Sequence, residues 1–342
     1  MEKGLPKEEE LQFPQDYYQY DKEGMKAILD DFPNQVRASI NLGNAIEITK
    51  SKNIFWFGMG GSAISGMLLK CYIGDSVQMG IVNDYDFPKH IPEDALLIFC
   101  SYSGNTEETL SCYKTAARKY KNVFSISSGG KLQEIAGMNR LQHMKIPKGI
   151  QPRNSIPYQV FPVLRILENA GIIANVDQEI MKFIDKIDMK QFAKHGAELA
   201  LKLKNKIPIV YASHRYYPVA YRLKCEINEN AKVHAFSHEF PELNHNEILG
   251  YTMLKGNFYG VILRFDDDHR RTQKRMELMK GIMKRSGVEV TELALKGPMI
   301  NKMFSAILIG DYASYYLALA YKIDPSPVNL IEKFKKDMGP YV

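Results

Sequence analysis

The sequence predicts an α/β protein with two doubly wound domains, each a mainly parallel sheet flanked by helices. Short apolar runs of strand length alternate with longer stretches of helical periodicity. The alternation occurs in two series, separated by a helix-rich stretch over residues 158–204. A length of 342 residues also exceeds one ordinary α/β layer and suits two domains, which we expect at residues 1–157 and 158–342.

The first series follows a polar leader. Residues 23–52 carry apolar side chains at helical spacing, which predicts one or two amphipathic helices. Expected strands are residues 53–57, 77–82, 95–100, 123–127 and 141–146, with helices at 63–72 and 106–120. Because strands that alternate with helices pair in parallel through right-handed crossovers, this half should form a doubly wound sheet.

The second series predicts the same architecture again. Expected strands are residues 207–212, 233–236, 259–265 and 289–294, with helices near 217–229, 270–285 and 303–321. The segment 266–271 carries three aspartates, a histidine and two arginines. We expect it to be a solvated turn before a helix and not a site.

Composition narrows the functional class. The net charge of +6 is spread thinly, and no long Lys/Arg run with interleaved aromatic residues indicates a nucleic-acid partner. Four cysteines without CxxC spacing suggest reduced thiols in a reducing compartment. No apolar stretch of signal-peptide length opens the chain, and none elsewhere is expected to span a bilayer. We therefore expect a cytoplasmic protein without a membrane partner.

A glycine-rich loop, Gly58–Ala63, lies between the first strand and the first helix of the sheet. Glycines allow the backbone to approach an anion, and a helix start offers unpaired N–H groups and a positive dipole end. The loop also matches the G-x-G-x-x-A dinucleotide fingerprint, and Asp84 near the end of the second strand would serve as its ribose-binding acid. A nicotinamide-dependent dehydrogenase is therefore an alternative at this point.

A second polar loop, Ser101–Thr106, leaves the third strand and enters another helix. The hydroxyls of Ser101, Ser103 and Thr106, together with N–H groups of the helix start, suit one phosphate monoester. A dinucleotide site needs no second phosphate-binding loop of this kind. The alternative is an ordinary helix N-cap followed by the acidic first-turn residues Glu107 and Glu108.

These two loops, GMGGSA and SYSGNTEET, resemble the sugar isomerase (SIS) domain. The segments PKGIQPR (147–153), NENAK (228–232) and PELNHNE (241–247) narrow the resemblance to the bifunctional phosphoglucose/phosphomannose isomerase family. The resemblance runs from Gly58 to the C-terminal helix. It implies two SIS-type domains and a homodimer. It also implies interconversion of glucose 6-phosphate or mannose 6-phosphate with fructose 6-phosphate through a cis-enediol, without metal or cofactor.

The resemblance also implies site residues, with the active site at the domain junction. The residues implied to bind substrate, chiefly its phosphate, are Gly60, Gly61, Ser62, Ser101, Ser103 and Thr106. Arg153 would face the sugar oxygens, and Glu229 would move a proton between C1 and C2. His245, supplied by the neighbouring subunit, would open the sugar ring. Lys322 is the candidate for the family's catalytic lysine.

The residue types suit this chemistry independently of the resemblance. Isomerisation removes a proton α to a carbonyl, so it needs a carboxylate such as Glu229 and a cation such as Arg153 against the enediolate. Ring opening needs an acid that titrates near neutrality, which a histidine provides. His238, Glu239 and His245 suggest zinc as an alternative, but their spacing is not HExxH, so we expect no metal.

Two further classes stay open. A non-catalytic sugar-phosphate regulator would keep the phosphate loops and dispense with Glu229 and His245, and the absence of an obvious helix-turn-helix segment disfavours it. A glutamine-dependent aminosugar synthase would have an amidotransferase domain before the SIS part, and no such domain is evident here.

Overall fold

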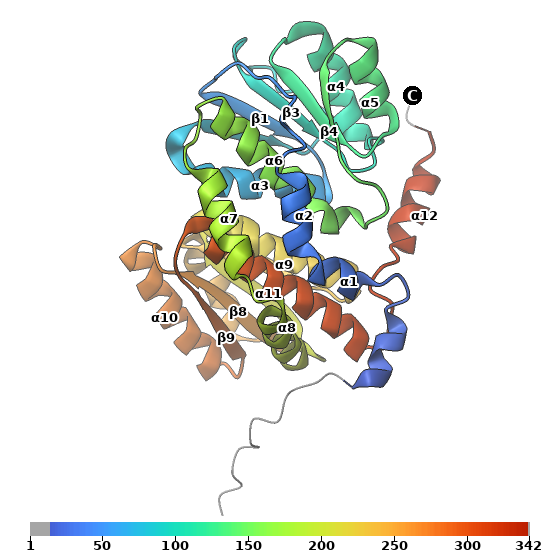
Figure 1. The fold of residues 1–342 in the computed structure, drawn as a ribbon. Coiled ribbons are helices and arrows are strands. Elements are labelled where there is room, and N and C mark those ends of the chain that lie inside the picture. The colour runs from blue at the N-terminus through green and yellow to red at the C-terminus, as the bar shows by residue number, and fades with distance from the viewer. Residues whose placement is uncertain (1–13, 341–342) are drawn as a thin grey trace, which may run out of the picture. The chain divides into compact units, whose positions relative to one another are not determined.

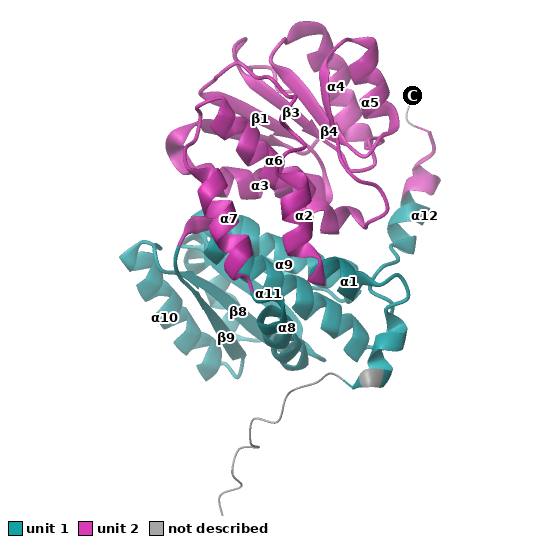
Figure 2. Ribbon diagram, viewed as in Figure 1, with its two compact units in different colours: residues 1–29, 188–297, 301–334 teal, residues 30–187, 298–300, 335–342 magenta. Residues whose placement is uncertain are grey.

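Two parallel sheets form the framework of the chain, one in each of two units (Figures 1 and 2). The computed structural model describes residues 14–340. Of these, residues 30–187, 298–300 and 335–340 belong to unit 2, and residues 14–29, 188–297 and 301–334 belong to unit 1. Most of the polar leader, on which we based the expectation of no signal peptide, lies outside the described residues.

The sheet of unit 2 has five parallel strands in the order β2-β1-β3-β4-β5. The strands are β1 (Asn53–Phe57), β2 (Gln78–Val82), β3 (Leu96–Cys100), β4 (Val123–Ser127) and β5 (Gln142–Lys145). All residues of β3 and β4 are buried, because helices cover both faces of a doubly wound sheet. This confirms the predicted fold of the first half.

Unit 2 contains the short 3₁₀-helix η2 (Gly74–Ser76) and seven further helices that surround or extend this sheet. They are α2 (Phe32–Ser39), α3 (Gly60–Ile73), α4 (Glu107–Lys119), α5 (Gly130–Met138), the 3₁₀-helix η3 (Pro152–Ser155), α6 (Ile156–Asn169) and α7 (Val176–Lys186). The chain turns from β1 toward β2 through α3 and from β3 toward β4 through α4. Right-handed crossovers in these opposite directions place α3 and α4 on opposite faces (Figure 1).

The sheet of unit 1 has four parallel strands in the order β7-β6-β8-β9, the same arrangement as the first four strands of the other sheet. The strands are β6 (Ile207–Ser213), β7 (Phe236–Phe240), β8 (Phe258–Phe265) and β9 (Glu289–Leu295). We predicted that the second half of the chain repeats the architecture of the first, and the shared strand order confirms this prediction.

The helices of unit 1 include α1 (Met25–Asp30), α8 (Met189–Leu203), α9 (Tyr217–Asn230), α10 (Arg270–Arg285), α11 (Met299–Ala320) and α12 (Asn329–Met338). Three methionines of α10, namely Met276, Met279 and Met283, are buried in a core with Tyr211 and Ile262 of the sheet. Their spacing of three and four residues places them on one face of the helix. The regularly spaced apolar residues that predicted a helix at 270–285 therefore form the face of α10 that packs on the sheet.

Helix α11 corrects one sequence expectation. We expected no segment able to span a bilayer, yet α11 has the length and mean hydropathy of such a helix, and it is the one helix of the described residues that does. Its most apolar window is 94% buried. An apolar helix of this length is also what the core of a globular α/β unit requires.

Other predictions differ from the structure locally. The strand expected at 233–236 is found at Phe236–Phe240, because its polar residues Ser237, His238 and Glu239 obscured the strand pattern. Helix α5 was not predicted at all, since Gly129 and Gly130 at its start and Gly137 near its end are typical of a loop. The compact units also divide the chain elsewhere than at residue 157. Helices α6 and α7 belong to unit 2, where α6 packs on α2 and α3.

The packing of Gly66 on Trp56 generates a stability prediction. A Cβ atom on Gly66 would lie 2.4 Å from the Trp56 ring, which is fully buried and whose Nε1 donates a hydrogen bond of 2.7 Å to the Ser62 carbonyl. Gly66→Ala should therefore lower the free energy of unfolding by about 1–3 kcal/mol, as overpacking does. Gly137→Ala in α5 is the matched control, because nothing lies within 4 Å of its added methyl group. Urea unfolding compares the two, and equal effects would contradict the packing argument.

Candidate functional site

The strand order of unit 2 reverses between β1 and β3, which are neighbours in the sheet. In doubly wound sheets, ligands bind at this switch point, beyond the carboxyl ends of the strands. The two loops singled out by sequence, Gly58–Ala63 and Ser101–Thr106, follow β1 and β3. A Cβ atom on Gly58 would lie 2.9 Å from the Cys100 carbonyl oxygen, so the two strand ends approach closely where Gly58 has no side chain.

The loop Ser101–Thr106 holds its own shape through hydroxyl groups. The Ser101 Oγ lies 2.8 Å from the Thr106 Oγ1 and accepts a hydrogen bond of 3.1 Å from the Gly104 N–H. Ser103 is exposed, and its Oγ accepts from the Asn105 N–H. Ser101 is buried, whereas Thr106 is half-buried at the N-cap of α4. The three predicted hydroxyl residues therefore share one loop, and the Ser101 hydroxyl stabilises that loop through hydrogen bonds within it.

The glycine loop lies against the segment that carries Arg153. A Cβ atom on Gly61 would lie 3.3 Å from the Arg153 Cα. Arg153 itself is 2% exposed, in η3. Burial to this degree is unusual for an arginine. Ser62 is buried in the first turn of α3, and Gly60 adopts a positive φ of 51° at the start of that helix.

A third loop at the same edge of the sheet was missed by the sequence analysis. Residues 127–130 follow β4, the neighbour of β3, and enter α5. A Cβ atom on Gly104 would lie 1.8 Å from the Gly129 carbonyl oxygen, and the Ser128 Oγ donates to the Tyr102 carbonyl. The signal was present as two serines and two glycines after a predicted strand, but it was overlooked because α5 was not expected.

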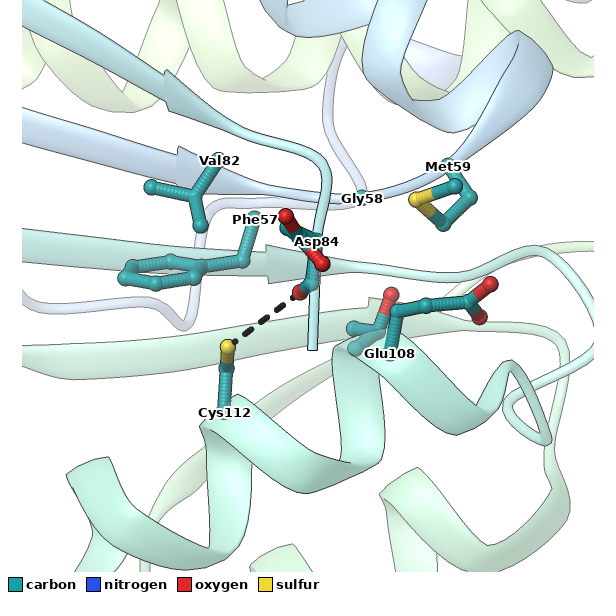
Figure 3. A pocket seen from close by; sticks show the side chains of 8 residues that line it. Phe57, Gly58, Met59, Val82, Asp84, Glu108 and Cys112 are labelled. Atoms are coloured by element: carbon teal, nitrogen blue, oxygen red, sulfur yellow. Dashed lines mark hydrogen bonds between the residues drawn. The ribbon is translucent and has the colours of Figure 1, made fainter. Parts of the chain in front are cut away.

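A small pocket lies beside the glycine loop (Figure 3). Its lining includes Met59, Asp84, Glu108 and Cys112. The Cys112 thiol donates to the Asp84 carbonyl oxygen, and burial, together with Asp84 and Asp86, raises its pKa to about 11.

The predicted proton-transfer residues belong to unit 1. Glu229 lies half-buried near the end of α9, and the Lys232 ammonium donates to its carbonyl oxygen. His245 is exposed at the end of η5 (Glu242–His245). Lys322 is exposed just after α11, with a positive φ of 57°. Lys232 also donates to the Pro325 carbonyl, so the end of α9 is tied to the segment after α11.

A buried polar network lies on the same helix as Glu229. Arg222 contacts Glu226 at 3.0 Å and Asp311 of α11 at 2.9 Å, and all three side chains are less than 10% exposed. Asn230 donates to both Glu226 and the Ser314 Oγ. One guanidinium between two buried carboxylates leaves an excess of negative charge. Burial accordingly raises the pKa of Asp311 to about 7, although Arg222 opposes this shift.

The solvated turn expected before a helix is confirmed at residues 266–269, ahead of α10, and its aspartates also form an ion cluster. Lys302, which is 5% exposed, contacts Asp266 at 3.0 Å and Asp267 at 2.5 Å. The Tyr216 hydroxyl also donates to Asp267, and Asp268 accepts from Ser213. Burial opposes the ionisation of Asp267, but hydrogen bonds from Lys302 and Tyr216 hold its pKa below the usual range. The sequence analysis did not foresee these ion pairs, because the partners come from distant parts of the sequence.

This cluster closes the equivalent edge of the second sheet. Ser213 ends β6 and Asp266 follows β8, the two strands between which the order of this sheet reverses. The described residues contain no group of three His, Cys, Asp or Glu side chains able to hold a metal ion, so His238, Glu239 and His245 do not form one. Glu239 contacts His214 instead, at 2.8 Å.

Comparison with known proteins decides the family. Residues 192–338 match the model of the bacterial phospho-glucose isomerase C-terminal SIS domain. The chain is 35% identical, over 90% of its length and 97% of the relative's, to a bifunctional phosphoglucose/phosphomannose isomerase of Caldicellulosiruptor bescii. This chain belongs to the bifunctional phosphoglucose/phosphomannose isomerase family. That assignment confirms the resemblance and sets the dehydrogenase alternative aside.

Other relatives of this isomerase-family chain define how far the similarity extends. A bifunctional phosphoglucose/phosphomannose isomerase of Thermoplasma volcanium is 34% identical over 89% of the chain and 97% of the relative. A D-glucosamine-6-phosphate 4-epimerase of Sulfolobus acidocaldarius is 31% identical over 84% of the chain and 90% of the relative. The family therefore includes more than one reaction on sugar phosphates.

Solved structures confirm the SIS-type fold of this isomerase-family chain. A hypothetical protein from Thermus thermophilus superimposes with a TM-score of 0.71 at 15% identity, covering 93% of the chain and 92% of that structure. The C-terminal domain of glucosamine-fructose-6-phosphate aminotransferase from Francisella tularensis gives 0.69 at 15% identity, with 90% and 98% covered. At these identities the likeness concerns the fold alone.

The raised pKa of Asp311 predicts a pH dependence of stability. In the folded protein the Asp311 carboxyl stays protonated up to about pH 7. In the unfolded chain its pKa has the ordinary value of 3.8, so the proton is lost at lower pH. Between these values the folded state binds more protons, so this group lowers the free energy of unfolding as pH rises, by at most about 1.4 kcal/mol per pH unit. Asp311→Asn should remove that decline in urea unfolding measured from pH 4 to 7. Asp267→Asn is the control, because a carboxyl with a lowered pKa should not alter the slope in that range; a wild-type slope equal to that of Asp311→Asn would contradict the assignment.

Proposed function

We propose that this chain interconverts fructose 6-phosphate with glucose 6-phosphate and mannose 6-phosphate by proton transfer through a cis-enediol. The observation that carries the proposal is the pair of loops at the β1/β3 switch point in a chain that belongs to this isomerase family. Hydroxyls of Ser103 and Thr106, with N–H groups at the starts of α3 and α4, would bind the phosphate. The phosphate would thereby anchor the end of the sugar that is common to all three substrates.

The proton-transfer step would use the family's residue types. The Glu229 carboxylate would remove the proton from C2 of the aldose or C1 of the ketose, and return it to the other carbon. The Arg153 guanidinium would stabilise negative charge on the enediolate oxygen. His245 would transfer the proton that opens the ring, and Lys322 is retained as the candidate catalytic lysine. Glucose 6-phosphate and mannose 6-phosphate differ only at C2, which is planar in the enediol, so one base can serve both.

We further propose a homodimer that acts in the cytoplasm without metal or cofactor, with His245 supplied by the partner copy. Leu249 and Met253 follow His245 in the same connection and are 69% and 73% exposed. Exposed apolar side chains beside an exposed candidate acid support a surface that a second copy covers. Four free cysteines in the chain are consistent with a reducing compartment.

A second candidate function is supported by the epimerase relative. A protein 31% identical to this chain acts, by its name, on D-glucosamine 6-phosphate at C4. The same phosphate loops would hold an amino sugar phosphate equally well, because they contact the common phosphate. Incubation with glucosamine 6-phosphate and separation of the two C4 epimers tests this function directly.

The proposal predicts a specific loss of binding when the N-cap hydroxyl of α4 is removed. Thr106→Val should weaken binding of fructose 6-phosphate by about 0.5–3 kcal/mol, because a hydrogen bond to a charged phosphate is lost. Thr109→Val, one turn further along α4, is the matched control. The Thr109 Oγ1 is buried and has no hydrogen-bond partner within residues 14–340. Calorimetric titration measures both variants, and equal affinities would place the phosphate elsewhere.

The assignment of the base predicts parallel loss of both isomerisations. Glu229→Gln should lower turnover of each aldose roughly a hundred- to ten-thousandfold, the usual contribution of a positioned general base, with sugar-phosphate binding largely retained. Glu292→Gln is the control, since Glu292 forms ion pairs with Arg264 and Lys280 outside the candidate site. A coupled assay starting from fructose 6-phosphate resolves both aldose products.

The same assay tests whether one site serves both aldoses. Glucose 6-phosphate and mannose 6-phosphate should inhibit each other's conversion competitively, and Glu229→Gln should reduce both reactions together. An aldose that is neither converted nor inhibitory would restrict the chain to one isomerisation. Unchanged turnover in the Glu229 variant would reject this base.

A further inference from the structure

The anion site of unit 2 is surrounded by three helix starts but contains few cations of its own. The loops Gly58–Ala63, Ser101–Thr106 and residues 127–130 lead into α3, α4 and α5, from the neighbouring strands β1, β3 and β4. None of these loop sequences contains lysine or arginine. Glu107 and Glu108 in the first turn of α4 add negative charge. Lys131 is the one cation in the first turns of these three helices, and the two glutamates outnumber it. A doubly charged phosphate at this edge therefore needs a further cation from elsewhere in the chain.

The segment 147–153 brings two cations to the three loops. Its Ile150 N–H donates to the Tyr102 hydroxyl at 3.1 Å, and its Arg153 backbone packs on Gly61. These contacts tie the segment to the loop after β3 and to the loop after β1. Arg153 is buried in η3 and is assigned to the sugar oxygens in the proposed function. The second cation is Lys148, to which the comparisons and the sequence motifs gave no role.

Lys148 lies against the third loop. A Cβ atom on Gly129 would lie 3.1 Å from the Lys148 Nζ and 3.2 Å from its Cε. Gly129 also contacts the Ser101–Thr106 loop, since a Cβ atom built on Gly104 would meet the Gly129 carbonyl oxygen. One glycine residue thus separates the ammonium from the phosphate loop.

The ammonium has no competing counter-ion in the described structure. Within residues 14–340, Lys148 forms neither an ion pair nor a hydrogen bond, and its side chain is exposed. An exposed lysine without a carboxylate partner can turn toward an incoming anion at little energetic cost, because no existing ion pair has to break. The other lysines of unit 2 include Lys121, which precedes β4 and so lies at the opposite, amino edge of the sheet.

We propose that Lys148 is a phosphate-binding residue that supplies the missing positive charge to the phosphate of the substrate. The proposal rests on the proposed function for the identity of the substrate, but the charge itself is a property of the anion site. Lys148 would contribute equally to the ground state and the transition state, since the phosphate takes no part in proton transfer. Its loss should raise KM without lowering kcat.

Binding of inorganic phosphate, measured by calorimetry at low ionic strength, tests the site without requiring any activity. Lys148→Ala should weaken phosphate binding roughly five- to twentyfold, as loss of a charge-assisted contact does. Lys148→Arg should retain most of the affinity, and Lys121→Ala should leave it unchanged. The difference between wild type and Lys148→Ala should shrink at high salt, because the Lys148 site is exposed. Thermal unfolding checks that all variants are folded.

Kinetics with fructose 6-phosphate form the second arm. Lys148→Ala should raise KM by a similar factor with kcat within about twofold of wild type. Phosphate affinity of Lys148→Ala equal to that of Lys121→Ala, or no phosphate binding by the wild type, would overturn the inference. If Lys148→Ala weakens phosphate binding but the wild type does not convert fructose 6-phosphate, the anion site stands and the proposed isomerisation falls.

Discussion

Close approach of backbone segments at the carboxyl edge of the five-stranded sheet is the constraint on which the candidate site depends. Gly58 lies against the end of β3, Gly104 against Gly129, and Gly61 against Arg153, each at a distance that a side chain would obstruct. Glycines at these positions allow three loops and the segment 147–153 to meet at one edge. The starts of α3, α4 and α5 therefore lie at the same edge of the sheet, and helix starts offer unpaired N–H groups to an anion.

The two sheets share their strand order but differ at the switch point. In unit 2 the edge presents hydroxyls and N–H groups, which can take an external anion. In unit 1 the anion at the corresponding edge is a side chain of the protein itself, the Asp267 carboxylate. It accepts a hydrogen bond from Tyr216 and contacts Lys302 and Arg215. Cations that could bind a ligand are thereby neutralised internally. Repetition of one fold has therefore produced one edge with hydroxyls and helix starts, where we propose an anion site, and one edge stabilised by ion pairs.

Unit 1 offers instead a helix, α9, with a buried charged face. Arg222, Glu226 and Glu229 are four and three residues apart, so they lie along one side of the helix. The first two are fully buried with Asp311, while Glu229 at the end of this row is partly accessible. A base needs both features, since contact with substrate requires access and a fixed position requires a rigid helix behind it.

The sequence by itself determined the fold class, the position of the loops Gly58–Ala63 and Ser101–Thr106 after two strands, and the family. The reason is that alternating strands and helices and the segments GMGGSA, SYSGNTEET and PELNHNE depend only on neighbouring residues. It did not reveal the Asp267–Lys302 cluster, the Arg222–Asp311 pair or the place of Lys148 beside Gly129. In each of these the two partners are separated by at least 19 residues in the chain and meet only when strands and helices pack. Helix α5 and its loop were missed for a related reason: their glycines and polar residues become meaningful only where they contact the Ser101–Thr106 loop. Local periodicity thus specified the elements, whereas tertiary packing decided which charges are neutralised, which are buried and which stay available to a ligand.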